Sequence, residues 1–275
     1  MGFSIRTNVA SLDAQKNLYQ SQLSLDSSLS KLSSGLRITK AGDDAAGLGI
    51  STNLEANIRS YNQAARNAND GISVVQTAEG ALNETTNILT RLRELAIQSA
   101  SDGVGSVQRG YINTEASQLT TEIDRIANAT EYNGTALLNT SSTSLTFQVG
   151  IRNVAANDRI SVSSVDATSA TLLGGTIDLS VRANAQAALS SIDAALTAVS
   201  TDRATFGAIG NRLNSAVATI QTASQNLSAA DSRIRDVNVA EETSNLSRLQ
   251  VLVQAGVSVL AQSNQQPQSA LKLLQ

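Results

Sequence analysis

Both ends of this 275-residue chain carry the apolar pattern of a helix that needs a partner. Apolar side chains recur there at steps of three, four and seven residues, which places them along one face of each helix. At the start they are Ile5, Val9, Leu12, Leu25, Leu29, Leu32 and Leu36, and at the end Leu246, Leu249, Val253, Val257 and Leu260. Neither stripe can be buried within its own helix. We therefore expect the two ends to pair as a coiled coil, with the middle of the chain as a projecting body.

The composition favours helices that pack closely on one another. Aromatic residues make up only 3% of the chain, and the 41% of hydrophobic residues are largely Ala, Leu, Val and Ile. The single proline is Pro267, so no proline interrupts the helical patterns before it. The net charge of −3 and the scattered basic residues leave no basic surface, so we expect no nucleic-acid partner.

The chain contains neither Cys nor His, which removes thiol nucleophiles, most zinc sites and the commonest general base. We therefore predict that it is not an enzyme and has no catalytic, cofactor or metal site. The first residues lack the apolar core of a cleavable secretory signal. The longest uncharged stretch, residues 249–271, is too rich in Gln and Asn to span a membrane.

The periodicities predict a mainly α fold. Residues 8–34 form one helix that ends at Gly35, and residues 46–100 form another that would be about 80 Å long. After a Gly-rich turn at 101–106 and a shorter helix, a two-residue alternation at 145–151 and 160–162 predicts a β-hairpin, and Ile177, Leu179 and Val181 extend the pattern. Helical spacing returns from 188 to 227. The expected architecture is a long antiparallel helical rod, with the hairpin at its outer end and a terminal coiled coil.

These patterns divide the chain into four parts. Residues 1–44 and 233–275 would be the two halves of a terminal coiled-coil domain, the part that the family resemblance described below places on the inside. Residues 45–182 would be the first part of a rod domain, with the β-hairpin region at about 132–182, and residues 183–232 its last helix.

Several segments resemble bacterial flagellin. They are residues 32–38 (LSSGLRI), 43–47 (DDAAG), 66–73 (RNANDGIS), 77–82 (TAEGAL), 93–96 (RELA), 258–262 (SVLAQ) and 267–271 (PQSAL). The likeness covers roughly residues 1–130 and 183–275. Many flagellins carry large outer domains in the middle, whereas this chain has only the hairpin region and resembles a minimal form.

The resemblance implies a structural subunit that polymerises into the flagellar filament, the helical propeller for swimming. It implies export of the unfolded chain through the flagellar type III system and an extracellular location. The implied partners are further copies of the chain, the flagellar cap and hook-associated junction proteins, and an export chaperone on the C-terminal region. Two alternatives remain: a hook–filament junction protein, and an enzyme or adhesin that uses the rod as a scaffold.

The resemblance also marks candidate sites. The terminal apolar residues named above would form the inner-core contacts of the filament. Arg91, Leu95 and Glu115 match residues that contact the flagellin-sensing toll-like receptor, and filament contact is the simpler interpretation of the same three positions. Flagellins modified on outward loops suggest O-glycosylation at Thr140, Ser141, Ser142, Thr143 and Ser144.

Two further motifs have simple structural interpretations. Gly47-Leu48-Gly49 lacks the third glycine of a dinucleotide-binding loop, so a role at a helix start is favoured. Asp43 and Asp44 lack the spacing of calcium ligands and suit the positive end of a helix.

Overall fold

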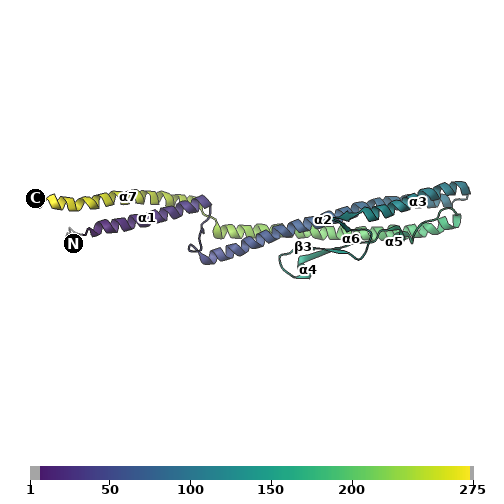
Figure 1. Ribbon diagram of the computed structural model, residues 1–275, viewed down its shortest axis with the longest axis horizontal. Helices are drawn as coiled ribbons and strands as arrows, with labels where there is room; N and C mark the ends of the chain where they lie inside the picture. The colour runs from purple at the N-terminus through teal and green to yellow at the C-terminus, as the bar shows by residue number, and fades with distance from the viewer. Residues whose placement is uncertain (1–6, 273–275) are drawn as a thin grey trace. The chain divides into compact units, whose positions relative to one another are not determined.

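The computed structural model describes the backbone of residues 7–272 and the side chains of residues 7–265 (Figure 1). The described elements follow one another in the order α1 (Val9–Ser34), α2 (Ala45–Ala100), α3 (Ser106–Ala129), β1 (Glu131–Tyr132), β2 (Thr135–Ala136), β3 (Ser144–Gln148), α4 (Ala155–Asp158), β4 (Arg159–Ser163), α5 (Ser169–Leu173), α6 (Arg182–Arg235) and α7 (Val239–Lys272). The predicted mainly α fold is confirmed. The chain divides into a central unit, Asn57–Gln225, and a terminal unit formed by the residues on either side of it.

In the terminal unit, α1 and α7 lie side by side and antiparallel (Figure 1). The amide of Asn8 donates to the carbonyl of Ser263 at 2.8 Å, and the hydroxyl of Ser28 donates to the Glu242 carboxylate at 2.5 Å. Helix α1 ends where the sequence predicts, because Gly35 adopts a left-handed conformation with φ of 73° that few other residues tolerate. The predicted pairing of the two ends is thus present in the fold.

The central unit is built on three helical segments packed along a common core. An ion pair between Arg93 and Asp193 at 2.7 Å joins α2 to α6, and one between Arg91 and Glu115 at 2.9 Å joins α2 to α3. The residues of the core repeat at steps of three and four, the spacing of coiled-coil contacts. On α2 they include Ala78, Leu82, Leu89 and Leu92, and on α6 Ile192, Val199, Phe206 and Leu213.

The connection between α3 and α6 holds two small antiparallel sheets. Strands β1 and β2 are joined by Asn133 and Gly134, which both have positive φ angles, the conformation of the tightest hairpin turns. In the second sheet, Leu145 pairs with Val162 and Phe147 with Ile160, so the predicted alternating hairpin is confirmed.

The pattern at residues 177–181 forms no strand. Ile177 and Leu179 are buried, but the backbone of Leu179 bonds to helix side chains: its N–H donates to Asn113 at 2.7 Å, and its carbonyl accepts from the Ser99 hydroxyl at 2.6 Å. Extended residues can alternate without a neighbouring strand when side chains satisfy their backbone. The expectation that this segment continues the sheet was therefore wrong.

The hairpin lies along the helices and not at the outer end of the unit. The amide of Asn67 donates to the carbonyl of Gln148 at 3.0 Å, and the ring of Phe147 covers Gly71. Residue 71 precedes the turn at residue 101 by 30 positions, about 45 Å along a helix. The predicted position was wrong because Gly71 leaves room for an aromatic ring between α2 and α6, and the hairpin docks there.

A comparison of two glycines in α2 tests this docking. A Cβ at Gly80 would meet none of the described atoms within 4 Å, whereas one at Gly71 would lie 3.1 Å from the Phe147 ring and 3.2 Å from Leu213. Gly80→Ala should raise the free energy of unfolding by about 0.5–1 kcal/mol, because alanine is the better helix former. Gly71→Ala should raise the free energy of unfolding by less than this, or should lower it. Urea unfolding of both variants measures the difference, and equal gains would contradict the proposed docking.

Asp202 supplies a pH test of the core. It follows Val199 by three residues and precedes Phe206 by four, so it falls on the buried stripe of α6. Burial raises the pKa of the Asp202 carboxyl above its ordinary value of 3.8. The folded state therefore disfavours the ionised form, and this destabilisation is present above the folded pKa and absent below the unfolded one. Asp202→Asn should stabilise the protein at pH 7 but not near pH 3. Urea unfolding at both pH values measures this. Equal effects of the substitution at pH 7 and pH 3 would contradict a destabilising effect of the buried Asp202 carboxylate.

Candidate interaction surface of the terminal helices

Small polar side chains, and not leucines, are the most deeply buried residues between α1 and α7. Ser11, Ser28 and Ser263 are each less than 9% exposed. The Ser11 hydroxyl donates to Asn264 at 2.8 Å. Gly256 adds to this close approach, because a Cβ there would lie 3.2 Å from Leu18. The two helices therefore meet through short side chains, and their larger apolar residues are pushed toward the edges of the contact.

The predicted seam residues fall into two groups. Those that are half-buried are Leu25, Leu32, Leu36, Leu246, Leu249, Val253 and Leu260. Those that are exposed are Val9, Leu12, Leu29 and Val257, with 46–60% of each residue accessible to solvent. Ile5 lies outside the described residues. The pair thus leaves part of the predicted seam uncovered.

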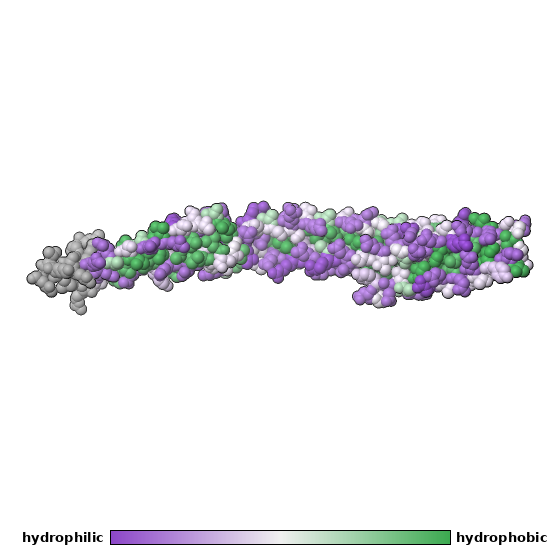
Figure 2. All heavy atoms as spheres, turned by 90° about the horizontal axis from the view of Figure 1, so that it is seen from above, coloured by the Kyte–Doolittle hydropathy of each residue, from purple (hydrophilic) through white to green (hydrophobic). Residues whose placement is uncertain are grey.

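Further large apolar residues extend this uncovered area on both helices. They are Tyr19, Leu23, Val251, Leu252 and Val259, each 48–66% exposed. Figure 2 shows hydrophobic residues gathered over the terminal helices, interrupted by polar ones. We call the exposed apolar residues of α1 and α7 the terminal-helix surface. Large exposed apolar areas of this kind mark places where another molecule binds.

The links beside this surface are held by backbone bonds. Arg37 donates its backbone N–H to the Arg235 carbonyl at 2.6 Å, and Val237 donates to the Gly35 carbonyl at 3.0 Å. Asp43 accepts from the backbone N–H groups of Thr39 and Lys40 and from the Thr39 hydroxyl, and the backbone bond from Thr39 is the largest cause of its lowered pKa. The two links are thus tied to each other and to the ends of the long helices.

The acidic pair at the start of α2 has the structural role that the sequence favours. Asp44 accepts from the backbone N–H of Gly47 at 2.8 Å, as a capping residue does. A Cβ at Gly47 would lie only 2.9 Å from Ile38, so this glycine permits close packing at the helix start. Within residues 7–265, no cluster of acidic residues has the grouping of a metal site.

The three residues that match receptor contacts do not share one exposed surface. Arg91 bonds to both Glu94 and Glu115 at 2.9 Å, and the side chains of Arg91 and Glu115 are about half exposed. Leu95 is only 1% exposed and belongs to the core of the central unit. Residue spacing alone could not reveal this, because positions 91 and 95 share a helix face and spacing does not show which of them is covered by a neighbouring element.

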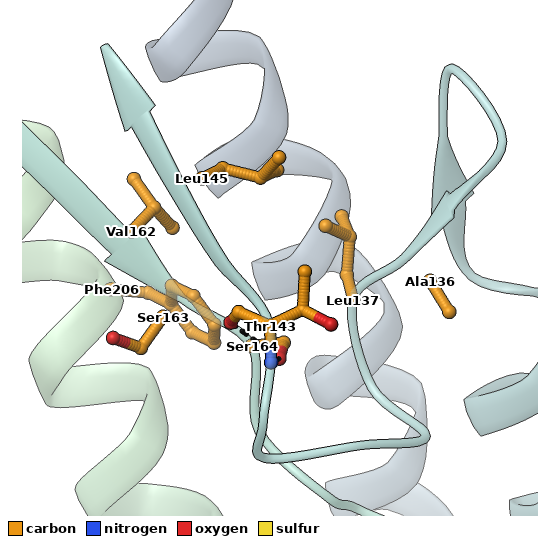
Figure 3. A pocket seen from close by; sticks show the side chains of 8 residues that line it. All are labelled: Ala136, Leu137, Thr143, Leu145, Val162, Ser163, Ser164 and Phe206. Atoms are coloured by element: carbon orange, nitrogen blue, oxygen red, sulfur yellow. Dashed lines mark hydrogen bonds between the residues drawn. The ribbon is translucent and has the colours of Figure 1, made fainter.

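The candidate glycosylation loop connects β2 to β3. Ser141, Ser142 and Ser144 are exposed, whereas Thr140 and Thr143 are half-buried. Thr143 donates its N–H to the Ser164 hydroxyl at 3.2 Å, and that hydroxyl donates to the Thr143 carbonyl at 2.8 Å. Figure 3 shows these two residues beside Leu145, Val162 and Phe206, around a gap too narrow for a water molecule. The base of the loop is therefore fixed, while Ser141 and Ser142 remain accessible.

The chain matches two family models. The model described as the bacterial flagellin N-terminal helical region matches residues 5–143, and the bacterial flagellin C-terminal helical region matches residues 189–274. None of the described helices is long and apolar enough to cross a membrane.

Curated relatives match over nearly their whole length. A flagellin from Halalkalibacterium halodurans is 42% identical over 270 residues, which cover 98% of this chain and 99% of the relative. The flagellar filament 33 kDa core protein of Treponema phagedenis is 39% identical over 287 residues, with coverage of 98% and 99%. The crystal structure of Bacillus cereus flagellin aligns with a TM-score of 0.52 and 31% identity, over 60% of this chain and 94% of that one.

The contact at Gly256 yields a test of the helix pair. Gly256→Leu should separate α7 from α1, because the larger side chain would occupy the space of Leu18. We expect faster amide hydrogen exchange along both helices, with exchange in the central unit unchanged. Ala255→Leu, at an exposed neighbouring position, is the control. Equal exchange in the two variants would show that Gly256 does not set the spacing of the helices.

Proposed function

This chain belongs to the bacterial flagellin family and is a structural subunit of the flagellar filament, and we propose that the terminal-helix surface is what joins its copies. The observation that carries this proposal is the exposure of Val9, Leu12, Leu29 and Val257 in the isolated chain. Full burial of one such side chain contributes about 1.5–3 kcal/mol. Burial of several in each subunit contact would supply a strong driving force for assembly.

The geometry of the surface suits an open polymer. Exposed apolar residues lie on both helices, so one subunit can contact different neighbours through α1 and through α7. A contact between two unlike patches generates a helical filament when its rotation does not close into a ring. We assign residues 1–44 and 233–275 to the inner part of the filament, and residues 45–182 and 183–232 to the layer around it.

The same surface supports the proposed flagellar partners. Cap and hook-associated junction proteins would meet the subunits at the two ends of the filament, where the terminal-helix surface has no further copy to cover it. An export chaperone would cover the exposed apolar residues of α7, such as Val251 and Leu252, before assembly. Passage of the unfolded chain through the flagellar type III system to the cell exterior completes this proposal.

Recognition by the toll-like receptor is a second proposal, favoured by the exposed Arg91–Glu115 pair. Both side chains are accessible on adjacent helices, and a hydrogen-bonded charge pair presents a defined polar shape. Because Leu95 is buried, its proposed part is to hold α2 in place beneath the pair. O-glycosylation is proposed for the loop at 140–144, where Ser141, Ser142 and Ser144 are exposed.

The family assignment also bears on the two alternative functions, a hook–filament junction protein and an enzyme or adhesin. The matches to flagellins cover almost the entire chain, which favours a filament subunit over a junction protein. An enzyme would need convergent polar groups in a cleft, and the chain offers neither His nor Cys for that role.

Val257→Asp tests the proposed role of the terminal-helix surface. A carboxylate placed in an apolar subunit contact must lose its hydration without a partner, so we expect the critical concentration for polymerisation to rise by at least about tenfold. Gln254→Asp adds the same charge one turn earlier, at a position that is already polar and exposed, and is the control. Sedimentation of the polymers measures both. If the two variants polymerise alike, Val257 does not lie in a buried contact.

A further inference from the structure

A pocket of about 450 Å³ lies on the central unit, apart from the residues of the terminal-helix surface. Its walls come from α2, from the β1–β2 hairpin and from β3. The lining residues are Asp70, Val74, Tyr132, Asn133, Thr135, Leu145 and Phe147. We call it the Asp70 pocket. These residues are far apart in the sequence. The docking of Phe147 on Gly71 brings them together.

The pocket concentrates aromatic rings in a chain that has few. The whole chain has four tyrosines and three phenylalanines, and two of these seven, Tyr132 and Phe147, line this one pocket. Both are half-buried, and Val74, which lines the same pocket, is fully buried. Aromatic faces carry partial negative charge and attract a cation that lies within about 6 Å. The apolar part of the pocket is therefore suited to a flat or extended cationic group.

Asp70 adds a full negative charge at the same place. It is exposed, and no described side chain donates a hydrogen bond to its carboxylate or forms an ion pair with it. Arg66, one helical turn earlier, is the nearest cation in sequence, but its guanidinium donates to Gln63 at 2.5 and 3.1 Å. The carboxylate is thus available to a group from outside the chain.

The cation that fits the Asp70 pocket is a guanidinium. Residues 57–225 contain arginine but no lysine, so arginine is the basic residue that the central unit of a neighbouring copy presents. A guanidinium can stack on an aromatic ring and donate two parallel hydrogen bonds to a carboxylate, which an ammonium group cannot do.

Arg152 is the loop residue among three arginines of the central unit, with Arg203 and Arg212, whose side chains have no partner among the described residues. It is exposed. Its loop is held in shape: Gln148 donates to the Arg152 carbonyl at 2.8 Å, and Val154 donates its N–H to Asp158 at 3.0 Å. A fixed loop presents the side chain with less loss of backbone freedom on binding.

We propose that the Asp70 pocket of one subunit binds the Arg152 side chain of a neighbouring subunit. Within its own chain, Arg152 lines a different hollow together with Tyr61 and Ile220, so the contact joins two copies. The proposal rests on the filament function and adds a polar, charge-specific contact between central units. Such a contact contributes to the choice of neighbour and register more than a purely apolar one would.

A charge exchange tests the contact. Asp70→Arg and Arg152→Asp, made singly, should each raise the critical concentration for polymerisation by about tenfold or more, because each places two like charges together. The double variant should return to within about threefold of the wild type, because the pair is restored in reverse. Glu84→Arg makes the same change of charge at an exposed position of α2 and should have little effect. Thermal unfolding of each monomer separates loss of assembly from loss of folding.

Two substitutions of Tyr132 test the role of the aromatic ring in the Asp70 pocket. Tyr132→Phe keeps the ring and should polymerise like the wild type, whereas Tyr132→Leu should raise the critical concentration by about threefold or more. If wild-type filaments form but the double charge variant is no better than the weaker single variant, the contact is overturned while the filament function stands. Wild-type assembly by Asp70→Asn would overturn it as well.

Discussion

The number of neighbours that a helix has in the folded chain determines what each part of this protein can do. A helix with apolar residues at steps of three and four presents a stripe that one partner covers only in part. In the central unit, α2, α3 and α6 cover one another, so that Leu82, Leu92 and Leu213 are fully buried. In the terminal unit, the main helix contact is that between α1 and α7, and Leu12 and Val257 remain exposed. The same sequence pattern thus gives a fully buried core in the central unit and a partly exposed apolar surface in the terminal unit.

This difference links the fold to the filament. A buried core stabilises the subunit whether or not it is assembled, whereas an exposed apolar surface lowers the free energy only when another molecule covers it. The terminal pair is held by small contacts, such as Ser28 with Glu242 and Leu18 against Gly256, which leave the larger side chains at its edges. Stability of the subunit and assembly of the polymer can therefore depend on separate sets of residues, and a subunit can fold its central unit without being committed to polymerise.

The β region gives the otherwise uniform helical surface its individual features. It contributes two aromatic rings: Phe147 covers Gly71, and Tyr132 lines the Asp70 pocket. The docked hairpin creates the Asp70 pocket and fixes the loop that carries Arg152. Apolar burial along the terminal helices is not directional and cannot by itself select one register among neighbours. Charge pairs and shaped pockets in the central unit are directional, so the two kinds of contact would serve different purposes in the same polymer.

The sequence alone determined the helices and the hairpin, because their signals are local: the end of α1 at Gly35, the long spacing of α2 and the alternation at Leu145 and Phe147. It also identified the family through short segments. Tertiary structure decided what covers each element, since that depends on residues distant in the chain. In the folded chain Leu95 is buried, and the backbone of Leu179 bonds to helix side chains and not to a strand. The hairpin docks at Gly71 and not at the outer end of the unit. Periodicity shows which face of an element is apolar, but only the packed neighbours determine whether that face is buried, docked or left exposed for another subunit.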